Sequence, residues 1–186
     1  MTLLILGVLL FAGVHFIPSL APGLKANWVG RMGENGYKGI FSLLLLGAFA
    51  LMITGWRGAQ PTYLYMPSPE LRHLAMLLLL LAFLLMVVSS RKSRLALLVR
   101  HPQLSGVTLW GVAHLLLNGD SRSLVLFGGM AVWAIGEMIA INHREGAWVK
   151  GDAPSWGAEL VTLVITLVVV GVVIYIHPWI AGMPVI

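Results

Sequence analysis

Charged residues leave long gaps along this chain, and almost uninterrupted apolar sequence fills them. In a helix, about 20 apolar residues at ~1.5 Å each match the ~30 Å hydrocarbon core of a bilayer. The pattern predicts six apolar spans: about Met1–Leu20, Gly36–Trp56, Leu71–Ser89, Leu104–Leu117, Leu124–Ile141 and Glu159–Ile180. Five are long enough to cross a membrane, and the fourth is short. Asn118-Gly119-Asp120 has turn composition, so the fourth and fifth spans are expected to form an antiparallel hairpin.

The composition supports a membrane class for the whole chain. Hydrophobic residues make up 59% and charged residues 10%, with a mean hydropathy of +0.91, whereas roughly a quarter of residues are charged in soluble domains. We therefore expect an all-α polytopic membrane bundle of about six transmembrane helices, with residues 1–186 as a single domain. The chain has no Cys, which excludes disulfides and thiolate ligands, so any redox chemistry needs a cofactor.

Basic residues are unevenly distributed between the two sets of loops. The loops after spans one, three and five hold nine Lys and Arg: Lys25, Arg31, Lys38, Arg91, Lys92, Arg94, Arg100, Arg144 and Lys150. The other side holds three: Arg57, Arg72 and Arg122. The positive-inside rule then puts both termini in the periplasm and the 91–101 loop in the cytoplasm. The net charge of +5 indicates contact with anionic membrane lipid and no nucleic-acid partner. The first span lacks a basic leader, so it is expected to be retained as a helix.

Two histidines lie well inside apolar spans, His15 in the first and His114 in the fourth, whereas His73 and His177 lie near span ends and are expected at the membrane interface. A histidine within a bilayer is costly unless it has a hydrogen-bond partner or a metal. Two neutral imidazoles that face each other from different helices form a typical haem b site, and Gly13, Gly111 and Ala113 would leave room for the macrocycle. The alternative is that each imidazole bonds a neighbouring carbonyl or hydroxyl, and that Gly111 only permits close helix packing.

The depths of these two histidines do not agree. From the cytoplasmic ends of the spans, His15 lies at ~7 Å and His114 at ~16 Å, whereas axial ligands of one iron need similar depth. Either the first span continues past Pro18, or the fourth span has a different boundary. The rival partners for His15 are His101 and His143, near the cytoplasmic interface.

Glu137 is the one carboxylate deep inside a predicted span, with Trp133 one turn before it. Such a group must be protonated, paired or hydrogen-bonded. It suggests a neighbour of a haem propionate, a substrate-binding group or a proton relay, and a hydrogen bond to a neighbouring helix explains it equally well. Asp120 and Arg122 are expected to form a local ion pair.

Arg100-His101-Pro102 has two interpretations. Pro102 suits the first turn of a helix, and Arg100 suits an interfacial anchor. Followed by Gly106, the tripeptide also resembles the motif of membrane methyltransferases of the isoprenylcysteine carboxyl methyltransferase type, in which it helps to hold S-adenosylmethionine. The chain lacks the acidic cytosolic element that completes such a site, so this function is the alternative.

The full string that begins at Arg100, RHPQLSGVTLWGVAHLLLNGD, resembles the signature of the NnrU family of integral membrane proteins. The family includes bacterial inner-membrane proteins associated with denitrification, and 15-cis-zeta-carotene isomerases. The resemblance implies haem b ligation by His15 and His114. From the residues themselves, Arg100, His101, Gly111 and Glu137 are the cofactor-binding candidates. The resemblance also implies either isomerisation of an apolar polyene or a role with a respiratory redox partner in nitrogen-oxide metabolism. The isomerases have a cysteine where this chain has Gly111, so a thiolate ligand switch is impossible here.

We predict that alkaline phosphatase fused after Ile186 is active and that a fusion near Ser93 is inactive, because the basic loops stay in the cytoplasm. A cytoplasmic reporter such as green fluorescent protein should give the reverse pattern. Phosphatase activity at Ser93 with none at the C-terminus would contradict this orientation.

Overall fold

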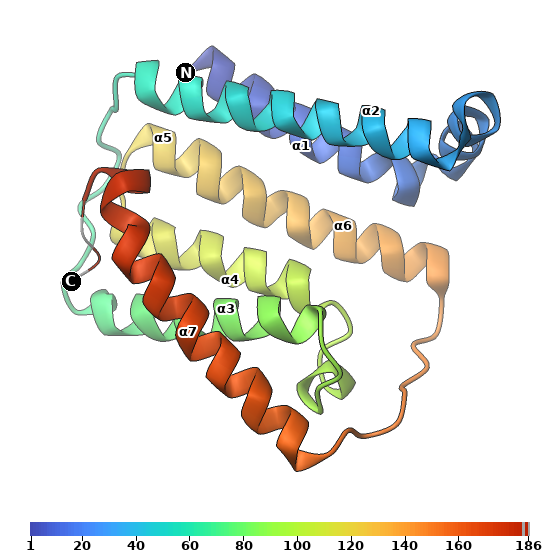
Figure 1. Cartoon of the computed structure of the whole chain (residues 1–186). Coiled ribbons are helices and arrows are strands. Elements are labelled where there is room, and N and C mark those ends of the chain that lie inside the picture. The colour runs from blue at the N-terminus through green and yellow to red at the C-terminus, as the bar shows by residue number, and fades with distance from the viewer. Residues whose placement is uncertain (184, 186) are drawn as a thin grey trace.

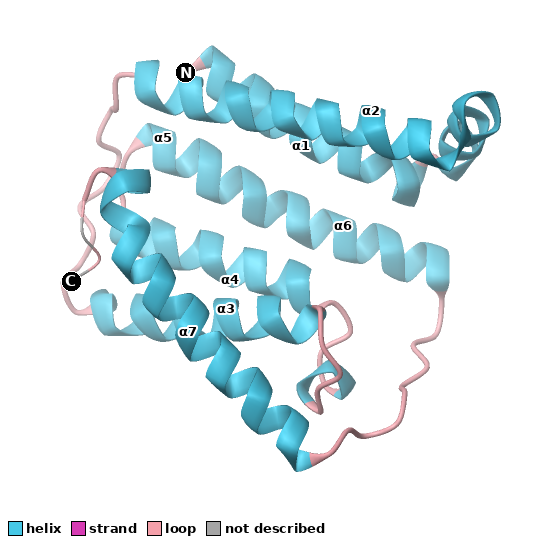
Figure 2. Ribbon diagram, in the orientation of Figure 1, coloured by secondary structure: helices cyan, strands magenta, loops and turns pink. Residues whose placement is uncertain are grey.

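The computed structural model describes residues 1–183 and 185 and contains only helices and connecting loops (Figure 2). The elements are α1 (Thr2–Leu20), α2 (Pro22–Gly58), α3 (Leu71–Ser89), the 3-10 turn η1 (Leu95–Leu97), α4 (Pro102–Leu117), α5 (Ser121–Ser123), the π-helical η2 (Leu124–Gly128), α6 (Gly129–Glu145) and α7 (Trp156–Ala181). Because α5, η2 and α6 are continuous, five helical segments are long and apolar enough to cross a membrane. The prediction of an all-α, multi-pass membrane bundle is confirmed.

The predicted spans agree with the helices except in the second. We predicted that it begins at Gly36, but α2 begins at Pro22 and is kinked at Gly33, where φ is +74° and ψ is 168°. The charges of this segment indicated a loop, yet proline suits a first helical turn. The ion pair between Lys38 and Glu34, 2.9 Å across one turn, also supports a helix. The fourth span is short as predicted, with 16 residues in α4.

The central element of the bundle is α6, which lies between the α1–α2 pair and the α3–α4 pair (Figure 1). It contacts α1 on one flank and α4 on the other, whereas α7 packs against α3. The contact of α4 with α6 confirms the predicted hairpin. Membrane helices that are short, such as α4, need neighbours to shield their ends from lipid, and α4 has α3 and α6 beside it.

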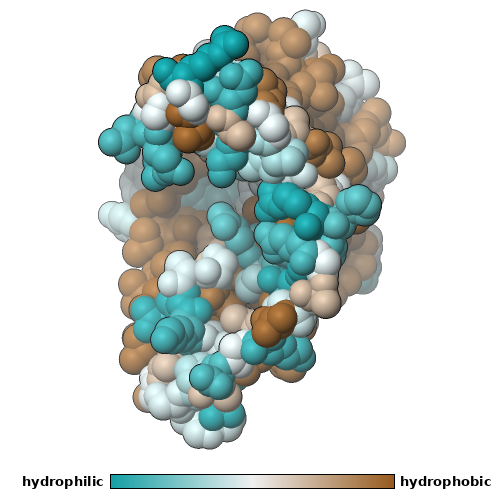
Figure 3. Space-filling model, turned by 90° about the vertical axis from the view of Figure 1, so that its right-hand side faces the viewer, coloured by the Kyte–Doolittle hydropathy of each residue, from teal (hydrophilic) through white to brown (hydrophobic). Residues whose placement is uncertain are grey.

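The two ends of the bundle are closed by hydrogen bonds between loops and helix termini. At one end, Nη1 of Arg144 donates to the carbonyl of Pro18 at 2.6 Å, and Nη1 of Arg100 donates to the carbonyl of Gly146 at 2.7 Å. We call this the basic end, where α1, α3 and α6 finish. At the opposite end, the loop after α2 pairs with the turn before α5. Figure 3 looks onto the basic end: hydrophilic side chains gather there around a hollow, and apolar surface covers the flanks.

The turn between α4 and α5 is held by Asp120. Its carboxylate accepts hydrogen bonds from the backbone N–H groups of Arg122 and Ser123 and from the Ser123 hydroxyl. Nε of Arg122 lies 3.5 Å from Oδ1, which confirms the expected ion pair. Burial raises the pKa of Asp120, but the hydrogen bonds from Ser123 and Arg122 lower it more, so its pKa lies below the ordinary value.

The apolar core lies where α1, α2 and α6 meet. Its buried members are Leu4, Val8, Phe11, Ala48, Met52, Trp133 and Ala134. The α1–α2 contact depends on a glycine: a Cβ on Gly55 would collide with the backbone nitrogen of Leu4. In lipid, helices associate largely through such close packing, because the hydrophobic effect gives no driving force where water is absent.

We predict that Gly55→Ala destabilises the bundle by about 1–3 kcal/mol, since backbone must move to admit the methyl group. The measurement is the thermal unfolding of the purified protein in detergent. Gly47→Ala, in the same helix, is the matched control because nothing lies within 4 Å of a Cβ at that position. Equal unfolding midpoints for the two variants would show that the α1–α2 approach is looser than described.

Candidate functional site

His15 lies in a cage of aromatic rings near the basic end of α1. Its ring centroid is 4.2 Å from Phe11, 4.9 Å from Trp133 and 5.5 Å from Phe41. Nδ1 donates a hydrogen bond to the Phe11 carbonyl at 2.9 Å. This bond fixes the tautomer, because the carbonyl can only accept, and it leaves Nε2 with an available lone pair. Histidines that bind metals are commonly oriented in this way.

Buried polar atoms lie on residues that contact His15 or its neighbours. One turn beyond His15, the Ser19 hydroxyl donates to Oε1 of Glu137, whose side chain comes from α6. Within the described residues, the other carboxylate oxygen of Glu137 has no hydrogen-bond partner, and neither does Nε1 of Trp133 or the hydroxyl of Tyr37. Glu137 is 6% exposed, and Trp133 and Tyr37 are each 7% exposed. Buried polar atoms are nearly always paired, so this cluster indicates a site for a polar ligand or ordered water.

His114 lies in a separate aromatic cluster. Nδ1 donates to the Trp110 carbonyl at 2.9 Å, and the ring stacks on Phe127 with centroids 4.3 Å apart. Phe127 also contacts Trp56 of α2 and Trp110 of α4. His114 therefore has the same backbone anchor as His15, but its neighbours lie toward the opposite end of the bundle.

The structure does not bring the two imidazoles together. His15 contacts Trp133, whereas His114 contacts Phe127, six residues earlier on the same continuous helical segment. Six residues correspond to about 9 Å along a helix. The histidines also approach this segment from different flanks, because α6 lies between α1 and α4 (Figure 1). The difference in depth expected from the sequence is therefore present, and one iron held by both rings would require α6 to move aside.

The small residues expected to make room for a macrocycle have other surroundings. A Cβ on Gly111 would lie 2.6 Å from the carbonyl oxygen of Phe127, so this glycine admits the backbone of the next helical segment. Gly13 is exposed, and it lies about 160° around α1 from His15. Ala113 is fully buried. Gly111 therefore permits close helix packing, which was the alternative interpretation of this residue.

The rival partners for His15 are also distant from it. Nε2 of His101 donates to Oδ1 of Asn142 at 2.8 Å, and Asn142 lies nine residues, or about 14 Å, beyond Trp133 along α6. His143 is the next residue and is exposed. Haem b itself stays a prediction, and with the two imidazoles apart, a haem in this bundle would have one of them as its histidine ligand.

Arg100 and His101 join the start of α4 to the end of α6. Besides its bond to Gly146, the Arg100 guanidinium lies 3.7 Å from the Glu145 carboxylate. The bond from His101 to Asn142 makes a second link. Both side chains are thus engaged in structural contacts at the basic end, where an S-adenosylmethionine carboxylate would need a free guanidinium.

Sequence reasoning found Glu137 and Trp133 but not Ser19, Tyr37 or Phe41. Ser19 lies four residues after His15, on the same face of one helix, and that spacing was the available signal. Tyr37 and Phe41 come from α2. Packing of α2 against α1 brings Phe41 to His15, and Tyr37 contacts Phe41.

The fold and site together define a polytopic helical membrane protein with a buried, aromatic-lined polar site. The family model described as NnrU protein matches residues 3–185, and the chain belongs to that family. No curated protein and no solved structure gives a significant match.

We predict that Arg100→Ala lowers the free energy of unfolding by about 1–2 kcal/mol, because the Gly146 carbonyl loses a charged donor. Thermal unfolding in detergent measures the effect, and Arg57→Ala is the control because Arg57 is exposed. Calorimetry with S-adenosylmethionine should show no saturable binding. Micromolar binding that Arg100→Ala abolishes would instead favour the methyltransferase function.

Proposed function

We propose that this NnrU protein binds haem b through His15 as its single protein ligand, and that the haem takes a nitrogen oxide or another small ligand. The observation that carries the proposal is an imidazole with a free Nε2 that lies against Trp133, whose buried Nε1 has no partner. Two more unpartnered buried polar atoms lie on Glu137, which bonds Ser19, and on Tyr37, which contacts Phe41.

His15 has the orientation that a metal ligand needs. The bond from Nδ1 to the Phe11 carbonyl holds the ring and raises the basicity of Nε2. Of the polar atoms nearby, Trp133 Nε1 and the Tyr37 hydroxyl are donors, which suit the carboxylates of a porphyrin. Glu137, with one oxygen bonded to Ser19, is placed to exchange a proton with a ligand at this site.

The separation of His114 from His15 bears on the chemistry. When bound, a haem iron with one imidazole ligand supplies an open coordination position, which favours gas binding or catalysis over electron transfer. His114, stacked on Phe127 and bonded to Trp110, then has a packing role between α4 and η2. This arrangement accords with the proposed role in nitrogen-oxide metabolism in a bacterial inner membrane, with both termini periplasmic.

We predict that the detergent-purified protein has the Soret absorption band of haem. After reduction to the ferrous state, this band should shift on addition of nitric oxide. His15→Gly should lose most of the haem, and added imidazole should restore the band, because the small ligand fits the space that the side chain leaves. His114→Ala should keep most of the haem. His73→Ala and His177→Ala are controls, because these histidines lie near helix ends at the opposite end of the bundle.

Equal haem loss in the His15 and His114 variants, with a six-coordinate low-spin spectrum, would overturn single ligation and favour the paired site. A colourless protein, expressed with ample haem and unable to take up hemin, would refute the haem proposal altogether. Isomerisation of an added polyene by the ferrous protein, with no effect of nitric oxide on its spectrum, would favour the isomerase over the nitrogen-oxide function.

A further inference from the structure

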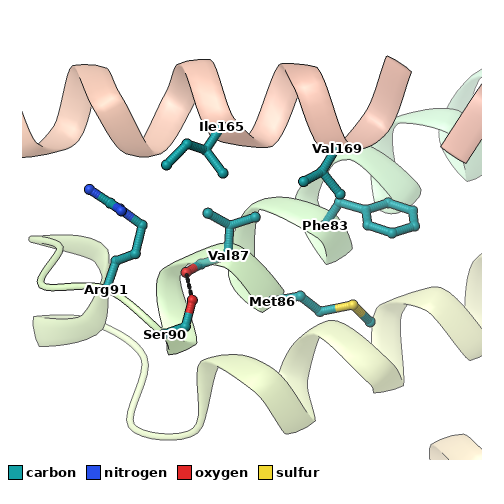
Figure 4. Close-up of a pocket in the computed structure, with 7 residues that line it drawn as sticks. All are labelled: Phe83, Met86, Val87, Ser90, Arg91, Ile165 and Val169. Atoms are coloured by element: carbon teal, nitrogen blue, oxygen red, sulfur yellow. Dashed lines mark hydrogen bonds between the residues drawn. The ribbon is translucent and has the colours of Figure 1, made fainter. Parts of the chain in front are cut away.

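A second site lies between α3 and α7, away from His15. A cavity of ≈ 440 Å³ opens there (Figure 4). Arg91 lies at one end of it, and Phe83 and Val169 lie at the other. Phe83 lies six residues before the end of α3 at Ser89, which corresponds to about 9 Å along the helix, and Arg91 lies beyond that end. The cavity thus has a cationic end and an apolar body.

Arg91 has no carboxylate partner among the described residues. It is half-buried and lies two residues beyond the end of α3, and Nε donates to the Thr162 hydroxyl of α7 at 3.2 Å. The nearest acidic side chain on α7, Glu159, bonds elsewhere. Its carboxylate accepts from the Ser93 hydroxyl at 2.9 Å and from the backbone N–H of Arg94 at 2.7 Å. The Arg91 guanidinium, which lines one end of the cavity, therefore has no counter-charge among the described residues.

The α3–α7 contact is open enough to admit a chain-like ligand. Of the α7 side chains, only Thr162 and Thr166 are buried, and each hydroxyl is bonded to a carbonyl of its own helix. The cavity walls are largely apolar, with Val87 and Met86 on α3 and Ile165 on α7 (Figure 4).

From this arrangement we infer that the α3–α7 cavity binds one anionic phospholipid, with the phosphate on Arg91 and an acyl chain along the apolar walls. A guanidinium at a helix end lies at the depth of lipid phosphates, and its planar donors match two phosphate oxygens. The apolar body takes the acyl chain without unpaired polar groups. The bound lipid fills the space between α7 and the rest of the bundle.

The test compares lipid binding to the whole protein after delipidation in a neutral detergent. Native mass spectrometry would count phosphatidylglycerol bound per chain, with phosphatidylcholine as the zwitterionic reference. We expect Arg91→Gln to weaken phosphatidylglycerol binding about tenfold, because it loses a charge-assisted contact. The matched control is Lys92→Gln, because Lys92 is the next residue, is exposed and does not line the cavity. We expect this variant to change phosphatidylglycerol binding less than twofold.

Two further measurements separate the parts of the site. Ile165→Trp fills the apolar body and should reduce binding of both lipids, with thermal unfolding as a check on folding. Soluble glycerol phosphate should not compete, because it has no acyl chain. Equal losses in Arg91→Gln and Lys92→Gln, equal binding of the two lipids, or full competition by glycerol phosphate would each overturn the inference.

Discussion

The packing of α6 between two helix pairs is the contact on which the rest of the bundle depends. On the side of α6 that faces α1, Gly129 and Gly136 have no side chain, so that Val8 and Phe16 can pack directly against the helix. Its continuation toward η2 places the Phe127 carbonyl against Gly111 of α4. Lipid gives helices no hydrophobic reason to associate, so small residues and close contact must supply the attraction. Without this element, the α1–α2 and α3–α4 pairs would share few contacts.

The central position of α6 also decides which polar side chains meet. It carries Trp133 and Glu137 to the face of α1 that holds His15 and Ser19, one turn apart on each helix. The same helix keeps His114 on its other flank and at a different depth. A helix that contributes to the polar site thus separates the two imidazoles that the family resemblance implied as paired ligands.

At the ends of the bundle, charged side chains form hydrogen bonds with backbone groups. Arg144 and Arg100 donate to carbonyls at helix ends and Asp120 accepts from amides at a helix start, where intrahelical partners are missing. Arg91 differs from these residues because its guanidinium has a hydroxyl partner and no carboxylate. This contrast separates the cations that complete the fold from Arg91, to which we assign the lipid phosphate.

The sequence alone determined the class of fold, the number of helices and most of their limits, because hydrophobic length against bilayer thickness is a local property of the chain. It also indicated Glu137 and His15, since an ionisable group in an apolar span is costly wherever the helix packs. It did not predict the helix at 22–32, where charges resemble a loop. The neighbours of each histidine were decided by the tertiary structure. The depth of each histidine, and the side of α6 on which it lies, depend on how α1 and α4 pack on α6. Helix periodicity places a residue on one face of its own helix, but it does not determine which other helix that face contacts.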